Sequence, residues 1–253
     1  RIDHKSYGMY KSLAGAYDCG KYVLHIDHVQ GDPFASPSRL RFEIKKADHG
    51  FPEEYWKEKH RKLALEDQVL RRFNGFLRKM DRGSKGSGKS GRITTCRTGQ
   101  KVLERIAVVF SENKMELRFE MGFPARGMSR LLFDILPKLA GGCLFYGRWD
   151  AGNRKRLQAA IFLADDQKAL REELEKRKLA AFVADGAVLP RESGISDLPM
   201  KEAVAFRSPE TLRTEIRLPH KGTITGMGIP EGITVIVGGG YHGKSTLLKA
   251  LEQ

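Results

Sequence analysis

Two short runs of glycine, lysine and serine have the spacing of a phosphate-binding loop. The pattern G-x-x-x-x-G-K-[ST] runs from Gly83 to Ser90 and occurs again from Gly238 to Ser245. In such a loop the backbone N–H groups and the lysine hold phosphate oxygens, and the serine or threonine hydroxyl coordinates Mg²⁺. Because the pattern is the same at both places, the elements on either side must decide which of the two can bind a nucleotide.

The second match has the context that the chemistry needs. Residues 232–237 are rich in β-branched side chains, which predicts a buried strand, and residues 246–252 predict a helix. We therefore expect ATP and Mg²⁺ here, with Lys244 at the β- and γ-phosphates and the Ser245 hydroxyl on Mg²⁺. The expected ATP-binding residues are Gly238, Gly239, Gly240, Tyr241, His242, Gly243, Lys244, Ser245 and Thr246.

The first match lacks this context. A charged helix precedes it, and residues 92–96 after it favour a strand, so no helix N-terminus faces a bound phosphate. We interpret Gly83–Gly91 as a flexible anion-binding loop or a linker, and not as a second nucleotide site.

The charge is concentrated around this first loop. The chain has 45 Lys and Arg against 31 Asp and Glu, a net charge of +14. Residues 57–105 contain 15 basic and 5 acidic residues, which leaves +10 in that window. Residues 53–80 predict one long helix, with one apolar stripe and cations on its other faces.

This basic region has two interpretations. Its cations can be ordinary solvated helix faces, or they can hold a nucleic-acid backbone together with the glycine-rich loop. For the second interpretation, the candidate RNA-binding residues are Arg71, Arg72, Arg78, Lys79, Arg82, Lys85, Lys89, Arg92 and Arg126.

Composition excludes several classes of protein. With 40% hydrophobic and 9% aromatic residues, the chain can build cores and is not globally disordered. No window approaches the roughly 18–20 uninterrupted apolar residues of a membrane span, so we expect no transmembrane helix. Cys19, Cys96 and Cys143 are far apart in the sequence, which argues against a disulfide framework or a cysteine zinc site.

Hydrophobic periodicity predicts an α/β protein with two domains. Residues 1–155 form a basic α+β domain, and residues 156–253 begin a P-loop ATPase core with antiparallel and parallel strands. In the first domain we also expect strands at 21–30, 40–44, 102–110 and 115–121, with a hairpin at 111–114, and a helix at 131–139. A helix or helix pair, broken at Asp165-Asp166, is expected at 153–179. The strands expected after it are at 180–183, 187–189, 203–207, 214–218 and 222–226.

Long strings of the sequence resemble the predicted ABC-class ATPases that have a dedicated N-terminal domain. These strings are VQGDPFASPSR (29–39), GSGKSG (86–91), FVADGAVLPR (182–191), GMGIP (226–230) and VGGGYHGKSTLL (237–248). The resemblance implies an ABC ATPase core that uses ATP and Mg²⁺, and a homodimer whose N-terminal domains supply a basic surface. One branch that the chain resembles is an accessory ATPase of kinetoplastid mitochondrial RNA editing, in which that surface binds RNA.

The resemblance also sets the expected function. The Walker B carboxylate and the signature loop of the family would lie beyond Gln253, so the chain is expected to be a piece of a longer protein, and its catalytic residues stay unknown. We expect an intracellular ATPase coupled to RNA binding, mitochondrial if it belongs to the kinetoplastid branch. The alternative is an ATP-switched interaction module whose basic face binds an acidic protein partner.

Overall fold

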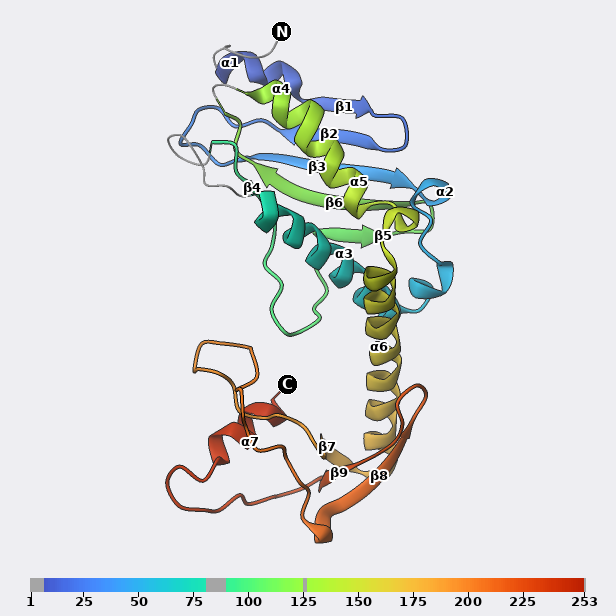
Figure 1. Cartoon of the computed structure of the whole chain (residues 1–253), viewed down its shortest axis with the longest axis vertical. Helices are drawn as coiled ribbons and strands as arrows, with labels where there is room; N and C mark the ends of the chain where they lie inside the picture. The colour runs from blue at the N-terminus through green and yellow to red at the C-terminus, as the bar shows by residue number, and fades with distance from the viewer. Residues whose placement is uncertain (1–6, 81–89, 125–126, 253) are drawn as a thin grey trace. The chain divides into compact units, whose positions relative to one another are not determined.

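The computed structural model of the chain describes residues 7–80, 90–124 and 127–252. These residues fold into two compact units (Figure 1). The first unit comprises the chain up to Ala160 apart from residues 99–101, and the second comprises those three residues and the chain from Ile161. The division falls inside one helix. The structure has helices and antiparallel sheets, and the α/β fold class is confirmed.

The first unit is built on an antiparallel sheet of order β1-β2-β3-β6-β4, with β5 also paired to β6. Its strands are β1 (Gly15–Asp18), β2 (Val23–His28), β3 (Ser38–Lys45), β4 (Ile93–Thr94), β5 (Val108–Phe110) and β6 (Lys114–Met121). Its helical segments are α1 (Tyr7–Tyr10), η1 (Lys11–Leu13), α2 (Lys46–His49), η2 (Glu53–Tyr55), α3 (Lys59–Met80), α4 (Met128–Arg130), a π-helical turn η3 (Leu131–Ile135), α5 (Leu136–Cys143) and η4 (Tyr146–Arg148).

The core of this unit lies between one sheet face and the helices α3 and α5 (Figure 1). Alternate residues of β3 and β6 are buried because successive side chains of a strand point to opposite faces. The buried side chains of β3 and β6 pack against the apolar stripe of α3. The main core residues are Leu40, Phe42, Ile44, Met115, Leu117, Phe119, Leu65, Val69, Leu70, Phe73, Leu136 and Leu139.

The helix expected over residues 53–80 begins only at Lys59. Residues 53–55 form a separate 3-10 turn, and Trp56 leaves the helical conformation with φ −134° and ψ 2°. Tyr55 and Trp56 are both buried. Neighbouring helix positions point about 100° apart, so a break in the helix lets both rings reach the core.

Two strand predictions in this unit have different outcomes. The hairpin at Ser111–Lys114 is confirmed, since Phe110 pairs with Met115 across it. The expected strand at 102–110 is wrong over most of its length, because only Val108–Phe110 pairs with β6. Val102, Leu103 and Ile106 are exposed.

The second unit contains a smaller sheet of order β7-β9-β8, with the strands β7 (Leu179–Ala184), β8 (Arg213–Leu218) and β9 (Gly222–Pro230). The helical segments here are η5 (Glu210–Leu212) and α7 (Lys244–Leu251), and α6 (Ala151–Arg177) runs into this unit from the first. All strand pairs among the described residues are antiparallel, so the parallel pairing that we expected is not found there.

Helix α6 is continuous, and the expected break at Asp165-Asp166 is wrong. Both carboxyl groups are buried and are used by the turn between β8 and β9. Asp166 accepts the amides of His220 at 2.8 Å and Lys221 at 3.1 Å, and Asp165 Oδ2 lies 2.8 Å from His220 Nε2. The His220 ring stacks on Phe162, with 4.0 Å between the ring centroids. Asp165 and Asp166 therefore hold the β8–β9 hairpin on α6 by hydrogen bonds.

Two further strand predictions, at 187–189 and 203–207, are also wrong. The segments do meet, because the Gly186 amide donates to the Phe206 carbonyl and the Phe206 amide donates to the Ala187 carbonyl, each at 2.8 Å. The two segments form no regular ladder beyond this exchange. In the described ranges no helix is long and apolar enough to cross a membrane, and Cys19, Cys96 and Cys143 are free thiols.

The buried Glu66 on α3 generates a pH-dependent prediction. Burial raises the pKa of its carboxyl to about 7. The hydrogen bond that Oε1 accepts from the Phe110 amide acts in the opposite direction and lowers the pKa, but burial has the larger effect. Because the folded protein holds this proton more tightly than the unfolded chain does, ionisation costs stability as the pH rises from about 4.5 to above 7. Glu66→Gln keeps an acceptor for Phe110 and should raise the free energy of unfolding at pH 8 by about 1–3 kcal/mol.

The same substitution should change stability little near pH 4, where the carboxyl is protonated in both states. Trp56 and Trp149 both lie in the first unit, so tryptophan fluorescence during urea unfolding reports on that unit. An equal effect of Glu66→Gln at both pH values would show that the pKa of this carboxyl is the same in the folded protein as in the unfolded chain.

The two amides held by Asp166 give a second prediction. Asp166→Ala removes the carboxylate that accepts both amides, which should destabilise the second unit by about 1–3 kcal/mol because hydrogen bonds to a charged group are the stronger ones. The direct measurement is amide hydrogen exchange at His220 and Lys221, which should accelerate at least tenfold. Glu172→Ala, which removes an exposed acid from the same helix, is the matched control and should leave both exchange rates unchanged.

Candidate functional sites: a glycine loop and a basic surface

The loop from Gly238 to Gly243 leads directly into α7, and Lys244 is the first residue of that helix. Gly243 has φ 77°, a left-handed conformation that glycine adopts without strain. The Lys244 ammonium donates to the Gly238 carbonyl at 2.6 Å and also to the Gly239 carbonyl. The loop therefore folds around its own lysine and fixes where that positive charge lies.

The start of α7 offers backbone donors next to this charge. The Leu247 amide donates a hydrogen bond to the Gly243 carbonyl at 3.0 Å, and this is the first main-chain hydrogen bond of the helix. The amides of residues 244–246 come before that bond, so they have no partner within the helix. Ser245 is exposed beside them. A lysine, a hydroxyl and free helix amides together fit the oxygens of a phosphate group.

The position of α7 is set by apolar packing in the second unit. Leu247 and Leu251 pack against a small core formed by Val183 of β7 and by Met227 and Ile229 of β9. The glycine loop is thus held by a helix that rests on the sheet. The structure confirms the helix that the sequence predicts after the loop, and it extends that helix back to Lys244.

The strand expected before the loop is not formed. Residues 232–237 pair with no strand among the described residues, and the side chains of Ile233, Val235 and Val237 are 97%, 75% and 83% exposed. A β-strand needs a neighbour to satisfy its backbone N–H and C=O groups. The β-branched sequence alone therefore does not produce a strand in this chain.

The elements around the first glycine loop agree with the sequence interpretation. Helix α3 ends at Met80 before it, and the short strand β4 begins at Ile93 after it. In the described residues from Ser90 to β4, no helix starts as α7 does after the second loop. The candidate residues Arg82, Lys85, Lys89 and Arg126 lie outside the described residues.

Two of the candidate RNA-binding residues are occupied by contacts within the first unit. Arg71 bonds the buried carboxylate of Asp67, to which Arg105 also donates at 3.0 Å. Arg72 Nε donates to the Gly142 carbonyl at 2.6 Å, and its guanidinium lies 4.7 Å from the centre of the Trp149 ring. Arg71 is therefore paired within α3, and Arg72 joins α3 to the segment that contains Gly142 and Trp149.

Arg78, Lys79 and Arg92 are different, since their side chains are exposed. Among the described residues none of the three has an ion-pair partner. Arg78 and Lys79 are in the last turn of α3, and Arg92 directly precedes β4. Of the candidate residues that the structure describes, these three on either side of the first glycine loop are therefore the ones with exposed and unpaired charges, and we call them the basic surface.

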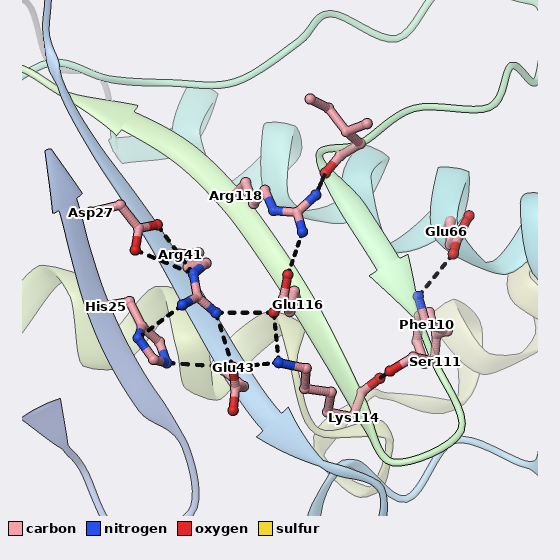
Figure 2. A network of polar contacts seen from close by, with 11 residues as sticks. His25, Asp27, Arg41, Glu43, Glu66, Phe110, Ser111, Lys114, Glu116 and Arg118 are labelled. Carbon is pink, nitrogen blue, oxygen red and sulfur yellow. Dashed lines mark hydrogen bonds and ion pairs between the residues drawn. The ribbon is translucent and has the colours of Figure 1, made fainter. Parts of the chain in front are cut away.

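The sequence interpretation missed a network of ion pairs on the sheet face opposite the helices (Figure 2). Arg41 Nη1 lies 2.9 Å from both Glu43 and Glu116, and Lys114 lies 2.9 Å from the same two carboxylates. Arg118 also bonds Glu116. The hydrogen bond from Lys114 holds the pKa of Glu43 below its ordinary value. The alternating charges of residues 39–45 and 114–120 were the signal for this network.

A second missed residue is Gln30, which is buried. Its Oε1 accepts the Phe123 amide at 2.7 Å, its Nε2 donates to the Asp32 carbonyl at 3.0 Å, and its own amide donates to Ser38 Oγ. This side chain joins the loop after β2 to the segment after β6. A buried glutamine between a strand and a proline-rich turn gives no periodic signal, so only the fold shows its role.

Comparison with known families accounts for most of the chain. Residues 153–253 match the family ABC_ATPase, described as a P-loop domain, and residues 1–146 match ABC_N, the N-terminal domain of ATPases of the ABC class. No curated protein matches the chain. The N-terminal match alone covers more than half of the sequence, and the P-loop match includes the glycine loop and α7. The chain therefore belongs to the family of ABC-class ATPases that have this N-terminal domain.

Proposed function

We propose that the chain binds ATP and Mg²⁺ at residues 238–246 as part of an ATPase, and that its first unit binds RNA. The observation that carries the nucleotide site is the position of Lys244, whose ammonium is held at the start of α7 by the carbonyls of Gly238 and Gly239. A lysine fixed in this way is already placed for phosphate oxygens, so little conformational freedom is lost when a nucleotide binds.

Each part of the loop has a distinct role in this proposal. The amides of the glycine loop and of the first turn of α7 donate to phosphate oxygens, and Lys244 supplies the positive charge. The Ser245 hydroxyl is the protein ligand for Mg²⁺ within the described chain. When bound, the metal neutralises phosphate charge. The exposed Tyr241, with φ 61°, lies in the middle of the loop, where its ring can contact the nucleotide.

RNA binding by the first unit is supported by the positions of the basic side chains that have no carboxylate partner. The cations on the open sheet face are neutralised by Glu43 and Glu116. Arg78, Lys79 and Arg92, by contrast, are exposed next to the first glycine loop. Cations without carboxylate partners can release the counterions of a nucleic-acid backbone, which is the main source of affinity without sequence preference. Homodimerisation and a mitochondrial location remain parts of the same proposal.

The nucleotide site is tested by exchanging lysines. Lys244→Ala should weaken Mg–ATP binding about 100-fold in isothermal titration calorimetry, because it removes charge-assisted hydrogen bonds to phosphate. Lys249→Ala, an exposed lysine on the same helix, is the matched control and should bind ATP normally. Lys89→Ala tests the first loop. If it abolished ATP binding while Lys244→Ala did not, the assignment of the two loops would be reversed.

RNA binding is tested by its dependence on salt. Replacing Arg78, Lys79 and Arg92 together by alanine should lower the affinity for RNA and reduce the slope of log K against log salt by about two, since each phosphate contact contributes about 0.7 for single strands. The control replaces Lys201, Arg207 and Lys249, which removes the same charge from exposed positions of the second unit.

The two sets of variants distinguish local contacts from overall charge. Equal losses in both would mean that net charge and not a defined surface attracts RNA. An RNA affinity that is immeasurably weak in the unchanged protein would contradict RNA binding and favour the acidic protein partner.

A further inference from the structure

The loop between β2 and β3 presents a large apolar side chain to solvent. Phe34 is 83% exposed, and it lies in the string 29–39 that neither the nucleotide site nor the basic residues account for. Single exposed apolar residues are common on protein surfaces and need no explanation by themselves. The features of this phenylalanine that point to a ligand are the way its backbone is fixed and the residues to which it is connected.

The backbone of Phe34 is held by a short set of hydrogen bonds. The Asp32 carboxylate accepts the amide of Phe34 at 2.8 Å and the amide of Ala35 at 2.9 Å, which closes a tight turn. The buried Gln30 donates to the Asp32 carbonyl at 3.0 Å. Pro33 and Pro37 on either side restrict the chain further. The ring is thus displayed on a fixed turn, and a ligand that contacts it does not have to order the loop.

The same hydrogen bonds connect this turn to the basic surface. Gln30 accepts the amide of Phe123, and the preceding residue, Gly122, exchanges backbone bonds of 2.8 and 2.9 Å with Gly91 and Arg92. A continuous series of hydrogen bonds therefore runs from Arg92 to Phe34.

The strand register places these segments at one end of the sheet. Ser38 and Ile93 are both paired with Met121, and β2 ends at His28, opposite Arg39. Figure 1 shows the end of α3, with Arg78 and Lys79 in its last turn, at this end as well.

An exposed aromatic ring at the same end of the sheet as unpaired cations suits one kind of ligand in particular. The cations bind a phosphate backbone, and the face of a phenylalanine ring stacks on a nucleic-acid base that is not already paired and stacked in a duplex. Phenylalanine has no polar group with which to distinguish bases, so the contact tolerates any sequence. We infer that Phe34 is a stacking platform for a base of single-stranded RNA whose phosphates are held by Arg92, Arg78 and Lys79.

This inference rests on the proposed RNA binding and adds to it a preference for single strands. Phosphate contacts alone bind paired and unpaired RNA, whereas a stacking ring contributes only where a base is free. Phe34→Ala should therefore weaken the binding of single-stranded oligouridine about tenfold and leave the binding of a blunt RNA duplex of equal length within twofold. Fluorescence anisotropy at fixed salt measures both affinities.

Three further variants separate stacking from other effects. Phe34→Tyr keeps a π face and should bind like the unchanged protein. Phe34→Leu keeps an apolar side chain without the ring and should lose about as much affinity as Phe34→Ala. Phe133→Ala removes another exposed phenylalanine, 75% accessible, from η3 and should have no effect. Because Phe34 is on the surface, thermal unfolding should show all variants folded.

The results of these binding experiments distinguish failure of the stacking role of Phe34 from failure of RNA binding itself. If the unchanged protein binds oligouridine and Phe34→Ala binds it equally well, the stacking platform is wrong and RNA binding stands. Equal losses for single strands and duplex would also overturn the platform, because they would show a general role in binding. If the unchanged protein binds neither RNA, the proposed RNA binding itself fails.

Discussion

The pairing of β3 with β6 is the constraint on which the first unit depends. The two strands are in register over eight residue pairs, from Ser38 opposite Met121 to Lys45 opposite Lys114. One face of this ladder supplies the rings and aliphatic chains of the core, and the other supplies the ion-pair network (Figure 2). A slip by one residue would bury the charges and expose the core, so both faces enforce the same register. That register also determines which loops meet at the end where Ser38 lies.

The ion-pair network limits where a polyanion can bind. Each of its two arginines and its lysine is paired with at least one carboxylate, so a phosphate would have to compete with Glu43 and Glu116 for them. Glu43 is kept ionised by Lys114, which holds its pKa below the ordinary value. The net charge of +14 is therefore an unreliable guide to binding. Of the candidate RNA-binding residues that the structure describes, Arg78, Lys79 and Arg92 are exposed and have no carboxylate partner, and they lie at the end of the sheet where Ser38 lies.

Sequence reasoning succeeded where the signal was local and failed where the partner was distant. The helix after the second glycine loop and the hairpin at Ser111–Lys114 follow from neighbouring residues, and both are confirmed. The carboxylates of Asp165 and Asp166 were interpreted as a helix break because their partners, at His220 and Lys221, lie 54 and 55 residues away. The strand predicted at 232–237 failed for a related reason: its composition suits a strand, but a strand exists only beside another one. Arg72 shows the same limit, since nothing in a basic helix sequence reveals that Trp149 engages it. The pair of Arg71 with Asp67, by contrast, has the i,i+4 spacing that a helix sequence does indicate.

Within the second unit, the contacts of α6 connect that helix to the sheet that supports the nucleotide loop. Helix α6 contributes residues to both units, and its Asp166 holds the turn that joins β8 to β9. Strand β9 pairs with β7, and the core that these two strands form is covered by Leu247 and Leu251 of α7. The helix that begins at Lys244 is therefore connected to α6 through two strands and one buried carboxylate. Loss of the Asp166 carboxylate would remove two of the contacts between α6 and this sheet, while the bond from Arg177 to the Glu215 carbonyl at 2.7 Å would remain.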